Sequence, residues 1–154
     1  EDEFLKKLET YFTLKPLENA PDIPEIIHGK EWAFGLILPE RAFKLRLKPE
    51  VLALMDWKFP KEVRELDLTV LHYYIIEKVL GIPGSQQRKS DKITFERNFT
   101  DCLTQVIKGQ SQMAIVTNEI TIDEVVKVCD SGYTLPQKST YFYPKVICGF
   151  LFTP

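Results

Sequence analysis

The residues best suited to chemistry lie close together near the end of the chain, in the stretch Thr134–Lys145. Lys138 and Lys145 supply two positive charges. Ser139 and Thr140 supply hydroxyl groups and backbone N–H donors beside them. This combination suits a phosphate or a carboxylate, because both anions take charge-assisted hydrogen bonds from ammonium and N–H groups. We therefore predict an anion-binding loop here.

Three consecutive aromatic residues, Tyr141, Phe142 and Tyr143, follow in the same stretch. Their rings can stack on a planar group such as a nucleobase. Pro136 and Pro144 stiffen both ends, which lowers the cost of ordering the loop on binding. The alternative is that the aromatics plug a core while the lysines extend to water. The sequence leaves both interpretations open, and the binding interpretation includes Tyr141 and Tyr143 among the site residues.

This stretch contains no acid–base partner, since no Asp or Glu follows Asp130. Glu96, Asp101 and Glu119 are candidates for a catalytic carboxylate only by default. The stretch is therefore expected to form one wall of a site. The catalytic half of the site is expected on a part of the protein outside this chain. We therefore interpret this chain as the C-terminal portion of a longer protein.

Histidine and cysteine positions do not indicate a metal site, because their spacing fits no common ligand set. His28 lies in a polar loop and is expected to be exposed. His72 lies in an apolar helix and is interpreted as a structural histidine, with catalysis as the alternative. Cys102, Cys129 and Cys148 are expected to be reduced core residues, which favours a cytoplasmic location.

Composition and charge favour one globular domain without a strong attraction for polyanions. The chain has 154 residues, of which 44% are hydrophobic, and a net charge of -2. The longest apolar runs, such as Val146–Phe152, are too short to cross a membrane. Nucleic-acid binding is a less favoured hypothesis. It would use the following basic side chains: Lys44, Arg46, Lys48, Arg88 and Lys89.

The hydrophobic pattern predicts alternating helices and strands along the chain. Apolar residues at helical spacing predict helices near 2–11, 24–27, 49–55, 67–80, 99–107 and 122–130. Asp67 is expected to be an N-cap and Thr121 the start of a capping box. In the last helix Ile122, Val125, Val126 and Cys129 are expected to face inward.

Strands are predicted near 32–38, 42–48, 93–95, 113–116 and 146–152, the first two as a hairpin. The expected fold is α+β, a single domain over residues 1–154. Its central sheet is expected to be mixed but largely antiparallel, with about five or six strands and about four or five helices packed on it. The Gly81–Asp91 stretch is expected to be a polar surface loop, and Trp57–Pro60 a flap over the core.

The stretch Leu135–Val146 resembles the C-terminal signature of a bacterial and archaeal family known as domain of unknown function 1015. Further resemblance lies in the opening Phe4–Phe12 followed by a strand, in Leu66-Asp67 leading into Leu71-His72, and in Leu80-Gly81-Ile82, so that it covers most of the chain. Family members are usually longer and carry an upstream Ala-Asp-Gly-His-His-Arg motif, which is absent here. They also typically have Met where Leu135 stands.

This resemblance implies a nucleotide-dependent function for the longer protein. The upstream motif is similar to that of ParB-like and sulfiredoxin-like nucleotide-using proteins, and some members are associated with a free-serine kinase role. ATP or ADP with magnesium would then bind in the whole protein, with the N-terminal domain as partner. Lys138, Ser139, Thr140 and Lys145 would complete a phosphate or amino-acid site. The alternative is a non-catalytic binding or assembly module, such as a homodimer.

Overall fold

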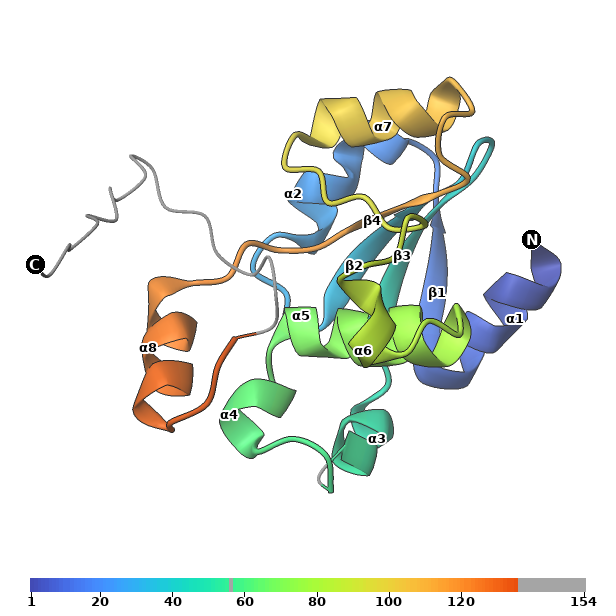
Figure 1. The fold of residues 1–154 in the computed structure, drawn as a ribbon. Helices are drawn as coiled ribbons and strands as arrows, with labels where there is room; N and C mark the ends of the chain where they lie inside the picture. The colour runs from blue at the N-terminus through green and yellow to red at the C-terminus, as the bar shows by residue number, and fades with distance from the viewer. Residues whose placement is uncertain (56, 136–154) are drawn as a thin grey trace, which may run out of the picture.

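The structure is a computed structural model that describes residues 1–55 and 57–135. Within these ranges the fold is α+β, with one open antiparallel sheet in the strand order β1-β3-β2-β4 (Figure 1). Its strands are β1 (Phe12–Leu17), β2 (Ala33–Ile37), β3 (Ala42–Leu47) and β4 (Ala114–Val116).

Helices pack on both faces of this sheet, so that β2 is buried along its whole length. The α-helices are α1 (Asp2–Tyr11), α2 (Ile23–Ile27), α3 (Pro49–Leu52), α4 (Lys61–Arg64), α5 (Asp67–Val70), α6 (Gly84–Gln87), α7 (Phe99–Ile107) and α8 (Ile122–Asp130). Two short 3-10 helices, η1 (Ala20–Asp22) and η2 (Ala53–Met55), and one π-helix, η3 (Leu71–Val79), complete the elements.

The larger core lies on the face covered by α1, α3 and the α5–η3 helix. Its largest fully buried side chains include Phe12 of β1, Phe34 of β2 and Tyr74 of η3. The ring of Phe12 meets the other two edge-on, at centroid distances of 6.0 and 6.5 Å. The Tyr74 hydroxyl donates to the Val51 carbonyl at 2.6 Å, which satisfies its buried polar atom.

A second core lies on the opposite face, where α2 and α7 pack on β2 and β4. Gly35 permits this approach, because an added Cβ there would lie 2.1 Å from Cγ2 of Ile23 in α2. A third, smaller cluster joins α4, the start of α5, and α8 through Val63, Leu66 and Val128. Together these clusters fix the elements that surround one end of the sheet.

Several local predictions are confirmed. The first helix, the hairpin of β2 and β3, the helix α7 and the short strand β4 form close to the expected ranges. The Thr121 capping box is present, with the Thr121 hydroxyl accepting from the Glu124 N–H and the Glu124 carboxylate accepting from the Thr121 N–H. Gly81, at φ +73°, ends the helix that contains η3.

The sheet prediction is partly wrong. The described part has four strands, all antiparallel, and eight α-helices, against about five or six strands and about four or five helices expected. Residues 93–95 form no strand, because this segment stays off the sheet and the Phe95 ring stacks on His72. The strand β4 pairs antiparallel with β2. The predicted strand at 146–152 lies outside the described residues.

Two loop predictions are also corrected. The stretch after Gly81 contains α6, whose Gln87 is buried because its amide donates to the carbonyls of His72 and Ile82. Of the predicted flap, Phe59 packs on the core, whereas the Trp57 side chain is 76% exposed.

The predicted inward face of α8 is wrong in part, because only one side of this short helix meets the third cluster. Val128 is buried, whereas Ile122, Val126 and Cys129 are exposed. Cys102 is half-buried, and Cys148 lies outside the described residues. No helix in the described ranges is both long enough and apolar enough to cross a membrane.

Candidate functional site

A broad hollow opens at the end of the sheet where β2 begins and β4 ends. Its walls come from segments far apart in the sequence: the loop after α2, the starts of α5 and α7, and the chain from β4 into α8. Figure 1 shows these segments gathered at the same end of the sheet. Because their mutual positions depend on the sheet, the hollow has no signature in any single stretch.

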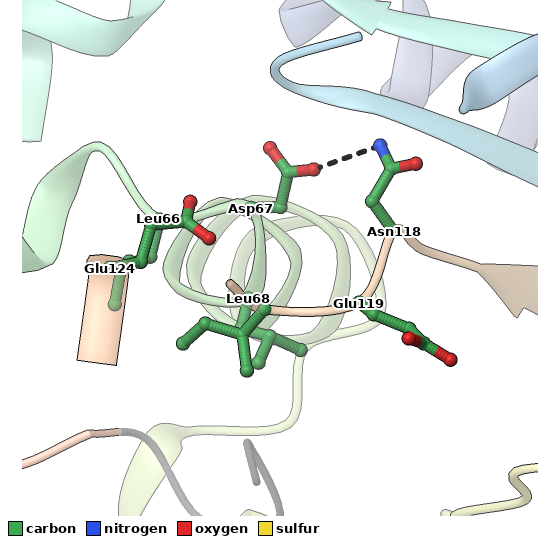
Figure 2. Close-up of a pocket in the computed structure, with 7 residues that line it drawn as sticks. Leu66, Asp67, Leu68, Asn118, Glu119 and Glu124 are labelled. Atoms are coloured by element: carbon green, nitrogen blue, oxygen red, sulfur yellow. Dashed lines mark hydrogen bonds between the residues drawn. The ribbon is translucent and has the colours of Figure 1, made fainter. Parts of the chain in front are cut away.

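Asp67 lies in the lining of this hollow and joins several of its segments. Its Oδ1 accepts the backbone N–H of Trp32 at 2.7 Å, and its Oδ2 accepts the Asn118 side-chain amide at 3.3 Å. The same amide donates to the Lys30 carbonyl at 3.1 Å. Figure 2 shows Asp67 and Asn118 pointing toward each other, whereas Glu119 points away. The carboxylate thus joins the start of β2, the end of β4 and the first residue of α5.

This geometry corrects the prediction that Asp67 is an N-cap. Leu66 occupies the cap position, and Asp67 is the first helical residue, with no side-chain cap hydrogen bond. Its carboxylate reaches across to the sheet because Trp32 presents an N–H there. The side chain therefore bonds to two other segments rather than to its own helix.

Burial raises the pKa of the Asp67 carboxyl above its ordinary value of 3.8. The hydrogen bonds from Trp32 and Asn118 oppose the rise, and the negative charges of Glu124 and Glu31 add to it. Partly buried carboxyls with raised pKa values are common at binding and catalytic sites, where a proton or a cationic group meets them.

Trp32 holds a strained backbone conformation beside this carboxylate. Its φ of 54° makes it the one non-glycine residue with a positive φ in the described ranges. A bulky side chain is costly in that region, so surrounding contacts must hold it there. They do so at both ends, since the Trp32 N–H binds Asp67 and the indole N–H donates to the Glu65 carbonyl at 2.9 Å.

Carboxylates outnumber cations in the lining of the hollow. The acidic residues are Glu31, Glu62, Glu65, Asp67, Glu96, Glu119, Asp123 and Glu124. The basic residues are Lys30, Lys61, Arg97 and Lys127. The buried Thr117 hydroxyl has no hydrogen-bond partner in the described part of the chain. The described wall therefore favours a cationic or hydrogen-bonding group.

The three carboxylates considered as catalytic candidates, those of Glu96, Asp101 and Glu119, differ in position. Glu96 lines the hollow, and its carboxylate accepts the backbone N–H groups of Asn98 and Arg97, which lower its pKa. Glu119 also lines the hollow, whereas Asp101 is exposed on α7. The hydrogen bonds of Glu96 come from its own loop, whereas those of Asp67 come from segments 35 and 51 residues away.

The predicted anion-binding residues Lys138, Ser139, Thr140, Tyr141, Tyr143 and Lys145 lie outside the described residues. The chain is described up to Leu135, which packs against the cluster of Val63, Leu66 and Val128. Leu66 is the residue next to Asp67, so the predicted loop starts beside the hollow.

The two histidines have different surroundings. His28 is exposed at the rim of the hollow. His72 is half-buried away from it, where its Nδ1 lies 2.6 Å from the Gln87 side-chain oxygen. This contact agrees with the structural interpretation of His72. Across the described ranges, no three His, Cys, Asp or Glu side chains gather as a metal site.

Asp67 and Asn118 are the site residues that the sequence did not reveal. Asp67 had a plausible local role as a cap, and Asn118 stands in an ordinary polar connection. Comparison of the chain with protein-family models, with curated proteins and with solved structures returned no match.

Proposed function

We propose that the hollow beside Asp67 binds a small zwitterionic molecule, an amino acid or its phosphate ester, together with the loop that carries Lys138. The main observation in its support is that Leu135 packs against the cluster of Val63, Leu66 and Val128, and that Leu66 of this cluster lines the hollow. Lys138 follows three residues later, so its backbone lies within about 11 Å of Leu135 even in a fully extended chain.

The two walls have complementary charges. The described wall presents the Asp67 carboxylate and an excess of acidic side chains, which suit an ammonium group. The loop contributes Lys138, Ser139, Thr140 and Lys145, which suit a carboxylate or phosphate. An amino acid carries both charges at once, so one molecule can contact both walls.

This proposal also extends the resemblance to a nucleotide-dependent family. In the longer protein, such a site would hold the amino acid for a phosphoryl transfer from ATP. No three His, Cys, Asp or Glu side chains gather among the described residues, and we derive no catalytic step through a magnesium ion. The chain by itself is expected to bind but not to turn over substrate.

Calorimetric titration of O-phosphoserine into the chain tests the proposal. Asp67→Asn and Lys138→Ala should each weaken binding by about tenfold or more, because each removes a hydrogen bond to a charged group, worth about 1.5–3 kcal/mol. Lys92→Ala is the control, since Lys92 is exposed and does not line the hollow. Equal affinity in Lys138→Ala and Lys92→Ala would exclude the loop from the site.

A non-catalytic assembly module is the second candidate, and the exposed face of α8 favours it. Ile122 and Val126 are 77% and 49% exposed, and Tyr133 follows them at 51%. This function predicts that Lys138→Ala has no effect on ligand affinity. It also predicts that Phe142→Ala lowers stability by about 3–5 kcal/mol, as truncation of a buried Phe does.

A further inference from the structure

A cluster of four basic residues lies on the open part of the sheet, distinct from the Asp67 carboxylate. Lys15 of β1 stands directly opposite Lys44 of β3, and Arg46 follows two residues later on the same face. Lys30, from the loop after α2, adds a fourth positive charge, which contributes to lowering the pKa of Lys44; its Nζ donates to the Ile26 carbonyl at 2.5 Å. We name these four residues the basic cluster.

Strand register places these side chains together. The other face of β1 and β3 carries the buried Phe12, Leu45 and Leu47, so the alternating residues must project to the face that α2 covers. Over β2 that face is closed by Ile23 against Gly35. Over β1 and β3 it carries the basic cluster, and Lys15 and Arg46 are exposed to solvent.

The arrangement is unfavourable without a ligand. Like charges directly opposite each other destabilise an antiparallel strand pair. Partial burial lowers the pKa of Lys44, and the positive charges of Lys30, Arg46 and Lys15 lower it further.

Three basic side chains in the described ranges form ion pairs with carboxylates: Lys7 with Glu3, Lys58 with Glu77, and Arg41 with Glu1 and Asp2. The described structure has no ion pair to a carboxylate for any member of the basic cluster. Lys15, Lys44 and Arg46 thus share one face of two neighbouring strands, with Lys30 nearby and no ion-paired carboxylate among the described residues, an arrangement that favours an anion.

We propose that the basic cluster binds a compact phosphate anion with several charges, of the class of an inorganic or nucleoside triphosphate. The cluster spans only two adjacent strands and two ladder positions, which suits a short anion. No aromatic side chain of β1 or β3 projects to this face to stack on nucleobases, as single-stranded nucleic-acid sites do. The proposal does not depend on the amino-acid site, although Lys30 also borders the hollow.

Calorimetric titration of inorganic triphosphate at constant ionic strength tests this assignment. The chain should bind one triphosphate, and Lys44→Gln or Arg46→Gln should weaken binding at least tenfold. The double variant Lys92→Gln/Lys108→Gln is the matched control. It removes more charge at exposed positions outside the cluster, and it should bind as the unchanged chain does. Equal loss in both would mean non-specific charge attraction and overturn the proposal.

Thermal unfolding supplies an independent readout. Without ligand, Lys44→Gln should raise the midpoint temperature of unfolding, because it relieves the repulsion between the basic side chains. Addition of triphosphate should raise the midpoint temperature of the unchanged chain by more than that of this variant. If Lys15 only protects the edge strand β1, Lys15→Gln should aggregate with no change in phosphate affinity, which would refute the proposal. If Lys44→Gln does not fold, Lys15→Gln at an exposed position gives the same comparison.

Titration of a single-stranded oligonucleotide into the chain is the third part of the experiment. Binding of the oligonucleotide without binding of triphosphate would overturn the assignment to a compact anion. Asp67→Asn should leave triphosphate binding unchanged, so failure of this proposal and failure of the amino-acid site give different results.

Discussion

At the scale of single residues, Asp67 combines a structural and a chemical role. Its carboxylate ties Trp32 and Asn118 together, and it remains partly buried with a raised pKa. A carboxyl whose pKa is raised by folding binds its proton more tightly in the folded state. Its contribution to stability is therefore present below the unfolded-state pKa and is lost as the pH rises through the folded-state pKa.

This sign gives a pH-dependent prediction for Asp67→Asn. The free energy of unfolding of the unchanged chain, relative to this variant, should fall as the pH rises above the ordinary Asp pKa of 3.8. Urea unfolding of both proteins across this range measures the difference. A difference that stays constant, or that grows with pH, would contradict the raised pKa.

The role of Asp67 could not be predicted from the sequence. A carboxylate just before an apolar helical repeat is an ordinary cap signal. Its actual partners, Trp32 and Asn118, are 35 and 51 residues away. Only the order of the strands brings them together, and local patterns do not encode that order.

At the scale of elements, α8 illustrates how a local signal can predict a helix but not its orientation. The capping box was predicted from Thr121 and Glu124 because it is a contact over three residues. The buried side was not predicted correctly, because apolar residues occur on two sides of α8 and only Val128 meets the third cluster.

Two matched substitutions test the orientation of α8. Val128→Ala, at a fully buried position, should lower the free energy of unfolding by about 1–3 kcal/mol. Val126→Ala removes the same atoms from the same helix at a position 49% exposed, and should change stability by less than about 0.5 kcal/mol. Chemical denaturation measures both. The opposite ranking would show that the exposed face of α8 is covered in solution.

The packing of α2 on the sheet gives a further prediction. Gly35→Ala should destabilise the chain by about 1–3 kcal/mol, because the new methyl group would overlap Cγ2 of Ile23. Ile23→Ala in the same chain removes that atom, so the double variant should lose less than the sum of the two single changes. Strictly additive losses in thermal unfolding would argue against this contact.

At the scale of the whole molecule, the α+β class and most local elements were predictable. Helical periodicity defined α1 and α7, and alternation defined β3. The strand count was overestimated because the short apolar run at 93–95 resembles a strand in composition but contacts His72 instead of the sheet. The hollow was not predictable, since its walls come from segments that meet only through the sheet order.

The central claim is that the hollow beside Asp67 binds a small zwitterion together with the Lys138 loop. Nuclear magnetic resonance tests it most directly, because the chain has two tryptophans with separate indole N–H signals. Trp32 borders the hollow, whereas the Trp57 side chain is 76% exposed outside its lining. Titration of O-phosphoserine should shift the Trp32 indole signal and the amides of Ser139 and Thr140 in a saturable manner, and leave the Trp57 indole unchanged. An unmoved Trp32 signal at a ligand concentration that shifts signals elsewhere would contradict the account.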